Sequence, residues 1–170
     1  SGTGKSSLAK ELVNIIPDCK LSISVTTREP RAGEVNGRDY HFIDKATFMQ
    51  MIDKDEFLEY SEVFDNMYGI LLAETEECLK NGQKLIFTID WQGAKILKKK
   101  KPDDIVSIYL LPPSLEELKN RLYKRNQDSK ETIEKRLSSL QEEISHYKDY
   151  DYVVINDDFK ETIDKLKAII

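Results

Sequence analysis

The stretch "SGTGKSS", residues 1–7, decides the fold. Its Gly4-Lys5-Ser6 step matches the closing end of the pattern G-x-x-x-x-G-K-[ST]. In such a loop glycines let backbone N–H groups turn toward phosphates, the lysine reaches the β- and γ-phosphates, and the Ser or Thr hydroxyl holds Mg²⁺. An amphipathic helix is expected directly after the loop, and its N-terminus attracts anions further. We therefore expect a phosphate-binding loop, with an ordinary glycine-rich turn as the alternative.

The first position of this pattern falls before Ser1. A phosphate loop is anchored by a strand that runs into it, and that strand is absent from the sequence. We expect an apolar strand of about five residues, the usual strand length, to lead into the loop from upstream.

Composition limits the class of protein. The 170 residues suit a single domain with a sizeable core. A net charge of -5 argues against nucleic-acid binding through bulk electrostatics. No apolar run approaches the ~20 residues of a membrane span. Cys19 and Cys78 are the only cysteines and lie far apart, which indicates reduced thiols and a cytoplasmic location.

Helical and strand periods alternate along the chain and predict an α/β fold. The predicted strands are residues 21–25, 40–43, 57–64, 84–89, 105–111 and 152–155. The predicted helices are, in round bounds, residues 6–16, 45–52, 72–80, 93–101, 115–122, 129–144 and 159–170. Most of these strands suit a parallel sheet, whereas residues 24–64 are typical of an antiparallel insert.

Three helix starts carry capping signals. Asp44 precedes the helix that contains Phe48, and "SLEE" at 114–117 is a capping box. Asp128 with Glu131 is expected to cap the long helix that follows.

Basic residues gather in the loop between the first two predicted strands. Arg28, Arg31, Arg38 and Tyr40 lie there among prolines and glycines. Guanidinium groups match phosphate oxygens in geometry, and a tyrosine hydroxyl adds a donor. A solvated loop with no ligand is the alternative, and composition alone favours it.

Several motifs occur together in one order: "SGTGKSS", "S-x-TTR-x-PR-x-GE-x-x-G-x-DYHF", "FLEY", "MYG", "ID-x-QGA", "LPPSLEELKNRL" and "VINDD". In this combination the chain resembles the guanylate kinases over essentially its whole length. The resemblance implies a P-loop three-layer fold with a central, mainly parallel sheet. It divides the single domain into a core at about 1–23, 84–113 and 137–170, a mixed α/β GMP-binding insert at 24–83, and a helical lid at 114–136.

The resemblance further implies ATP and GMP as small-molecule substrates, with Mg²⁺, and GDP and ADP as products. Catalytic roles fall on Lys5, Arg125 and Arg136. ATP-binding roles fall on Ser1, Gly2, Thr3, Gly4, Lys5, Ser6, Ser7, Arg121 and Asn156. GMP-binding roles fall on Ser24, Arg28, Arg31, Tyr40, Glu59, Tyr68 and Asp90. Ser6 would hold Mg²⁺, and Asp90 would act on the metal through water.

The role that the resemblance assigns to Glu59 agrees with the chemistry of guanine. Guanine presents N1–H and N2–H₂ side by side, and one carboxylate accepts both. Adenine would leave the buried carboxylate unpaired, a penalty that supports discrimination on the order of 10⁴. A polar residue on the outer face of a strand is the alternative for Glu59.

The sequence departs from the family pattern at two positions. Ile70 stands where relatives usually have Ser or Thr, and Thr88 stands where they usually have an acidic residue two before Asp90. One neutral hydrogen bond contributes about 0.5–1.5 kcal/mol, so we expect weaker GMP binding but retained catalysis. The lid stretch "KRNQD" also lacks the glycines common beside its arginine.

Two other functions stay open at this point. One is a non-catalytic guanylate-kinase-like module that binds a protein, although such modules typically lose the phosphate loop that Lys5 and Ser6 preserve here. The other is a kinase of a different nucleoside monophosphate, which Glu59 and Ser24 oppose. The sequence carries no signal for the oligomeric state.

Overall fold

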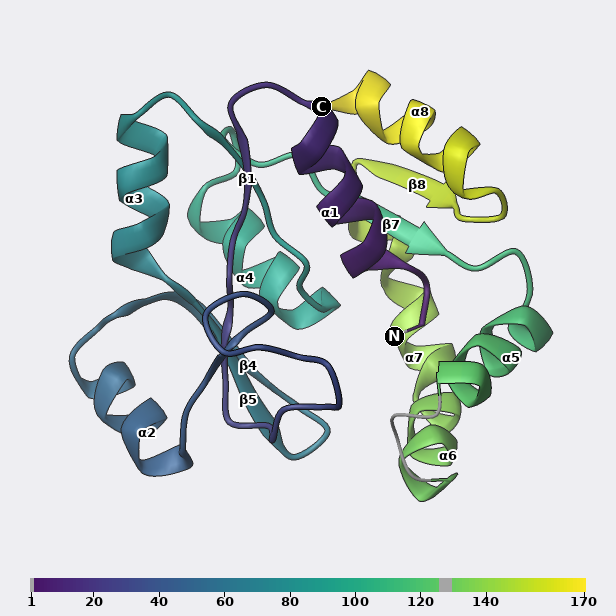
Figure 1. The fold of residues 1–170 in the computed structure, drawn as a ribbon, viewed down its shortest axis with the longest axis horizontal. Helices are drawn as coiled ribbons and strands as arrows, with labels where there is room; N and C mark the ends of the chain where they lie inside the picture. Colours follow the sequence, from purple (N-terminus) through teal and green to yellow (C-terminus); the bar gives the residue numbers. More distant parts are fainter. Residues whose placement is uncertain (1, 126–129) are drawn as a thin grey trace. The chain divides into compact units, whose positions relative to one another are not determined.

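Helices and strands alternate along the chain and confirm the α/β class (Figure 1). The computed structural model describes residues 2–125 and 130–170. The helices are α1 (Lys5–Ile15), α2 (Lys45–Asp53), α3 (Leu72–Lys80), α4 (Trp91–Lys100), α5 (Leu115–Arg125), α6 (Lys130–Ser138), α7 (Leu140–Ser145), the 3₁₀ helix η1 (His146–Asp149) and α8 (Phe159–Ile169). The strands are β1 (Cys19–Leu21), β2 (Val25–Thr26), β3 (His41–Phe42), β4 (Phe57–Val63), β5 (Asn66–Leu71), β6 (Lys84–Ile86), β7 (Ile108–Leu111) and β8 (Tyr152–Ile155).

The chain divides into two compact units. The first unit combines Ser1–Ile16 with Val106–Ile170, and the second unit is Pro17–Ile105. The first therefore contains the phosphate loop, and the second contains the arginine-rich loop.

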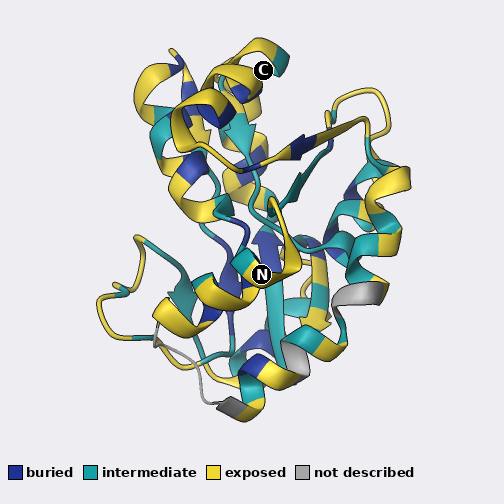
Figure 2. Ribbon diagram, turned by 90° about the vertical axis from the view of Figure 1, so that its right-hand side faces the viewer, coloured by how far each residue is buried: buried dark blue, intermediate teal, exposed yellow. Residues whose placement is uncertain are grey.

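A parallel strand pair organises the first unit. β7 pairs with β8 from Ile108↔Tyr152 to Leu111↔Ile155. At the start of the pair, Asp151 Oδ2 accepts hydrogen bonds from Ser107 N at 2.8 Å and Ser107 Oγ at 2.7 Å, which fixes the register. α8 packs on β8 and on α1. Figure 2 shows buried residues on one side of these helices and exposed residues on the other, the amphipathic pattern of surface helices.

The second unit contains two sheets. β1 and β6 form a parallel pair, and a four-stranded mixed sheet has the order β3-β2-β5-β4. The β4–β5 and β2–β5 pairs are antiparallel, as expected for the insert, but β2 and β3 are parallel. Both cysteines belong to this unit and are free thiols.

Helix α2 covers the mixed sheet through an aromatic contact. Asp44 caps it as predicted, since its Oδ1 accepts from Thr47 N at 2.8 Å. Phe48 has no exposed surface and stacks on Phe57 with ring centroids 4.5 Å apart. Burial of one such side chain contributes about 1.5–3 kcal/mol.

The predicted strand at 21–25 is wrong, because this segment belongs to two sheets. Ser22 N still donates to Ile86 O at 3.0 Å and extends the pairing with β6. Val25, however, pairs with His41 and Gly69 in the mixed sheet. One straight strand cannot serve both sets of partners, so the chain breaks into β1 and β2.

Strand β5 was not predicted. Phe64 and Asp65 both have positive φ, 49° and 65°, and connect Val63 to Asn66 in a two-residue hairpin turn. Such turns favour Asn-Gly or Asp-Gly, so Phe-Asp gives only a weak turn signal. The predicted strand at 57–64 consequently ends one residue early.

The helices that follow β7 differ in their bounds from the predicted ones. The capping box at 114–117 is confirmed in part, since Ser114 Oγ accepts from Glu117 N at 3.0 Å. The predicted long helix instead consists of α6 and α7, with Ser139 between them. Its predicted cap, Asp128, lies outside the described residues. Strands β6 and β7 are shorter than the predicted 84–89 and 105–111.

Candidate functional site

The phosphate loop of the first unit has the backbone that its sequence predicts. Gly2 and Gly4 have φ of 79° and 92°, a region that glycine adopts without steric cost. Gly4 caps α1 and accepts a hydrogen bond from Leu8 N at 3.0 Å. Lys5 therefore begins the helix, and Ser6 and Ser7 lie exposed in its first turn. Ser1 lies outside the described residues.

Asn156 braces this loop, a role that sequence reasoning did not find. The residue is 6% exposed and follows β8 directly. Its Nδ2 donates to Thr3 O at 2.7 Å, and a Cβ on Gly4 would lie 2.4 Å from that nitrogen. Because Gly4 has no side chain, the amide can reach the loop backbone. Sequence separation of 153 residues between the partners explains why no local pattern reveals the contact.

Helix α5 also contacts this part of the site. Arg121 Nε donates to Glu117 Oε1 at 2.9 Å, and its Nη1 donates to Asn156 O at 3.2 Å. A Cβ on Gly2 would lie 2.9 Å from Leu118 Cδ1, so the loop passes close to this helix. Arg125 is the last residue of α5 and Arg136 belongs to α6, but their side chains lie outside the described residues.

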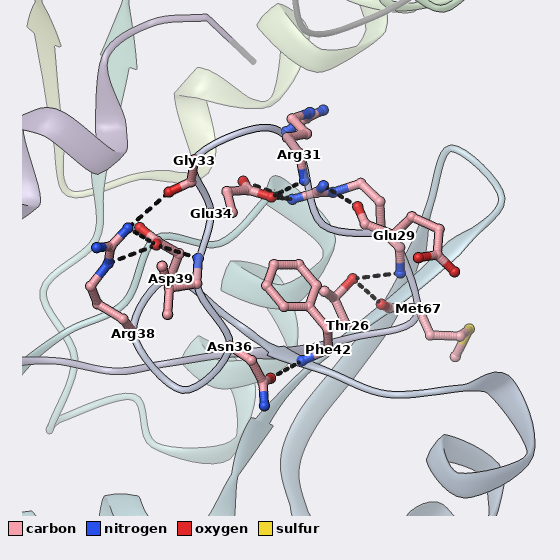
Figure 3. Close-up of polar contacts among 12 residues, drawn as sticks. Thr26, Glu29, Arg31, Gly33, Glu34, Asn36, Arg38, Asp39, Phe42 and Met67 are labelled. Carbon is pink, nitrogen blue, oxygen red and sulfur yellow. Dashed lines mark hydrogen bonds and ion pairs between the residues drawn. The ribbon is translucent and has the colours of Figure 1, made fainter.

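Glu34 organises the arginine-rich loop of the second unit (Figure 3). Both oxygens of its carboxylate accept from one nitrogen, Arg28 Nη2, which lies 3.0 Å from Oε1 and 2.9 Å from Oε2. Its Oε2 also accepts from the backbone N of Arg31 at 2.8 Å. Burial lowers the pKa of the Arg28 guanidinium, but Glu34 and Tyr68 outweigh that effect and the pKa is raised overall. Two of the predicted phosphate ligands are thus held by one carboxylate.

Arg38 has a different environment from these two arginines. Its Nε and Nη2 donate to Asp39 Oδ2 at 2.9 and 2.7 Å, and Nη2 also donates to Gly33 O at 2.9 Å. Figure 3 shows it on the other side of the loop from Arg31. These contacts close the loop on itself.

Two tyrosines lie beside Arg28. The Tyr40 ring centroid is 5.4 Å from Arg28 Cζ and 6.1 Å from the Tyr68 ring centroid. Burial, and then the neighbouring Tyr68, raises the pKa of the Tyr40 hydroxyl, so that it stays protonated as a donor. The structure therefore brings together Arg28, Tyr40 and Tyr68, three of the predicted phosphate ligands.

Glu59 lies on β4 and is only 3% exposed. Burial, and then the negative charge of Asp90, raises the pKa of its carboxyl group to about 7, while Lys100 opposes the shift. Its Oε2 is buried and makes no hydrogen bond with any described residue. This excludes the alternative of a polar residue on an outer strand face.

Ile70 is the cross-strand neighbour of Glu59 and has no exposed surface. Paired residues project from the same face of a sheet, so an apolar side chain adjoins the carboxyl group. The departure at this position thus contributes to the apolar surroundings of Glu59.

Two further predicted GMP ligands, Asp90 and Ser24, make hydrogen bonds with the backbone of neighbouring elements. Asp90 caps α4, and its Oδ1 accepts from Gly93 N at 2.8 Å. Ser24 is 8% exposed, and its carbonyl accepts from His41 N at 2.9 Å.

Residues 2–125 and 130–170 contain no cluster of three or more His, Cys, Asp or Glu side chains arranged to hold a metal ion. Within the same ranges, every helix is too short or too polar to cross a bilayer.

The chain is similar to known guanylate kinases in sequence and in structure. The family model described as guanylate kinase matches residues 1–170. The guanylate kinase of Maricaulis maris (strain MCS10) is 48% identical over 170 residues, which cover 100% of this chain and 78% of the relative. The guanylate kinase of Rickettsia prowazekii (strain Madrid E) is also 48% identical, over 86% of its length. The crystal structure of guanylate kinase from Anaplasma phagocytophilum has a TM-score of 0.84 and 36% identity, covering 99% of this chain and 79% of that one.

Proposed function

Because the chain belongs to the guanylate kinase family, we propose that it transfers the γ-phosphoryl group of ATP to GMP, giving ADP and GDP. The observation that carries the proposal is the buried Glu59 carboxyl group, whose Oε2 lacks a partner among the described residues. The intact phosphate loop disfavours the alternative of a non-catalytic module.

Glu59 is proposed to select the base. Guanine offers N1–H and N2–H₂ to the two carboxylate oxygens, whereas adenine offers no N1 proton. An unpaired buried carboxylate is costly, so AMP is rejected rather than merely bound less well. Ser24 and Asp90 are proposed to complete the nucleoside contacts.

The GMP phosphate is proposed to bind Arg28, Arg31, Tyr40 and Tyr68. Arg28 is already charged, half-enclosed by aromatic rings and fixed by Glu34. A pre-positioned donor loses little conformational entropy on binding, which favours affinity.

The triphosphate is proposed to bind the backbone of residues 1–7 with Arg121 and Asn156 nearby. Lys5 would neutralise the β- and γ-phosphates. Mg²⁺ in such enzymes takes one or two protein ligands besides phosphate oxygens and water. The exposed Ser6 hydroxyl in the first helical turn fits that limited contribution, and Asp90 is proposed to act on the metal through water.

Catalysis then requires positioning and charge neutralisation. GMP presents an ionised phosphate as the acceptor, so no general base is required. Lys5, Arg125 and Arg136 are proposed to stabilise the charge that shifts during transfer.

The subdivision into core, insert at 24–83 and lid at 114–136 is proposed on the family resemblance. Phosphorylation of dGMP and a cytoplasmic location are part of the same proposal. Lid closure would exclude water, which would otherwise hydrolyse ATP.

One assay tests the function. ADP formation is measured with GMP, dGMP, AMP, CMP and UMP as acceptors, for the wild type and Lys5→Ala. We expect activity with GMP and dGMP that Lys5→Ala largely removes. Equal rates with AMP would overturn the assignment of substrate, and GMP binding without ADP formation would support the non-catalytic module instead.

A further inference from the structure

We propose that Gly93 is a positioning residue for Glu59, because the space left by its missing side chain is where the carboxyl group lies. A Cβ built on Gly93 would be 2.8 Å from Glu59 Oε2 and 3.1 Å from Oε1. Both distances are shorter than ordinary van der Waals contact. The inference rests on the proposed guanine-binding role of Glu59.

Helix α4 packs against strand β4. Near its start Gln92 Nε2 donates to Glu62 O at 3.3 Å, and at its end Lys100 Nζ donates to Leu58 O at 2.5 Å. Both acceptors belong to β4, and they flank Glu59 in sequence. The helix and the strand are thus joined on either side of the Glu59–Gly93 contact.

The backbone of Gly93 gives no other reason for a glycine. The residue lies in the third position of α4, where alanine is the better helix former. Its N–H donates to Asp90 Oδ1, a bond that alanine would keep. The required absence of a Cβ therefore points to the neighbouring carboxyl group.

A Gly93→Ala substitution would act on Glu59 rather than on the fold. The atoms that the new methyl group meets belong to the end of the Glu59 side chain, which can rotate away. The displaced carboxyl group would no longer face N1–H and N2–H₂ together. IMP lacks the 2-amino group, so preference for GMP over IMP measures this double contact.

The experiment compares GMP, IMP and AMP as acceptors in Gly93→Ala, Glu59→Asp and the double variant. Gly93→Ala is expected to raise the KM for GMP roughly tenfold, with kcat changed less than about threefold, and to reduce the GMP/IMP preference by a similar factor. Aspartate is shorter and withdraws the carboxyl group from Gly93. Adding Gly93→Ala to Glu59→Asp should therefore raise the KM for GMP less than about twofold.

Controls separate this inference from the function on which it rests. Lys95→Ala, at an exposed position of the same helix, should leave all three KM values unchanged. If Glu59→Gln keeps full base selectivity, the proposed role of Glu59 fails irrespective of Gly93. If Glu59→Gln loses base selectivity while Gly93→Ala keeps it, only the inference about Gly93 is overturned. The same holds if Gly93→Ala raises the KM for GMP by the same factor in the wild type and in Glu59→Asp. Thermal unfolding of each variant shows whether it is folded.

Discussion

At the scale of single residues, the state of Glu59 explains how an acidic side chain can be both buried and useful. Its surroundings favour the neutral acid, and its pKa of about 7 lies well above the ordinary 4.5. A neutral carboxyl group has one donor and cannot accept from both guanine N–H groups at full strength. Binding of guanine should therefore be linked to loss of a proton from Glu59.

We accordingly predict that the affinity for GMP increases with pH. Between pH 6 and pH 8 the ionised fraction of a group with a pKa near 7 rises about tenfold, and the KM for GMP should fall by a similar factor. The GMP phosphate also titrates near pH 6, but that effect is shared by Glu59→Gln. The measurement is the ratio of the KM for GMP of the wild type to that of Glu59→Gln, taken across this pH range. A ratio independent of pH would contradict the linkage.

The same pKa fixes the sign of a stability effect. The folded chain holds the Glu59 proton more tightly than the unfolded chain does. Stability from this source is present below about pH 4.5 and is lost as the pH rises through about 7. Denaturant unfolding without nucleotide, compared with Glu59→Gln, measures this loss independently of catalysis.

At the scale of helices and strands, the sequence predicts the features that depend on neighbouring residues and misses those that depend on distant partners. The phosphate loop, the Asp44 cap and the bounds of α3 and β8 were predicted because each depends on residues adjacent in the chain. The break between β1 and β2 depends on distant partners, and the hairpin into β5 uses an atypical turn. Glu34 was part of a predicted motif, but its two hydrogen bonds from Arg28 become visible only in the folded loop.

The loop element yields a prediction for Glu34→Gln. An amide keeps one acceptor oxygen and places its NH₂ group near the Arg28 guanidinium, so one of the two charge-assisted hydrogen bonds is lost. We expect the KM for GMP to rise at least about tenfold, since a hydrogen bond to a charged group contributes about 1.5–3 kcal/mol, with a smaller change in kcat. Glu29→Gln is the matched control, because Glu29 accepts from Arg28 through its backbone carbonyl, which the substitution leaves in place. Equal effects of both variants would remove the positioning role from Glu34.

The phosphate loop yields a prediction for Asn156→Ala. The variant loses the 2.7 Å hydrogen bond to Thr3 O, which holds the loop backbone. Loss of one hydrogen bond costs about 0.5–1.5 kcal/mol, so the KM for ATP should rise about 2- to 10-fold. Asn120→Ala, at an exposed position of α5, is the control. An unchanged KM for ATP in Asn156→Ala would show that the loop keeps its shape without this brace.

At the scale of the whole molecule, the residues proposed for the two substrates are distributed over two units. Asn156 bonds to Thr3, Leu111 and Arg121, all within the first unit. The partners of Glu34 are Arg28 and Arg31, all within the second. Each set of side chains is therefore held by contacts within its own unit. The chain passes from one unit to the other at two points along its sequence.

This division predicts that Glu34→Gln and Asn156→Ala act independently on the binding of the two substrates. Substitutions with no shared partners usually add within about 0.3–0.5 kcal/mol, which corresponds to about a twofold error in a KM. In the double variant Glu34→Gln with Asn156→Ala, the KM for GMP should match that of the first single variant and the KM for ATP that of the second. Steady-state kinetics with one substrate varied and the other saturating measure both values. If Asn156→Ala alone raises the KM for GMP as much as that for ATP, the phosphate loop controls the geometry of both substrates, and the assignment of one substrate to each unit is wrong.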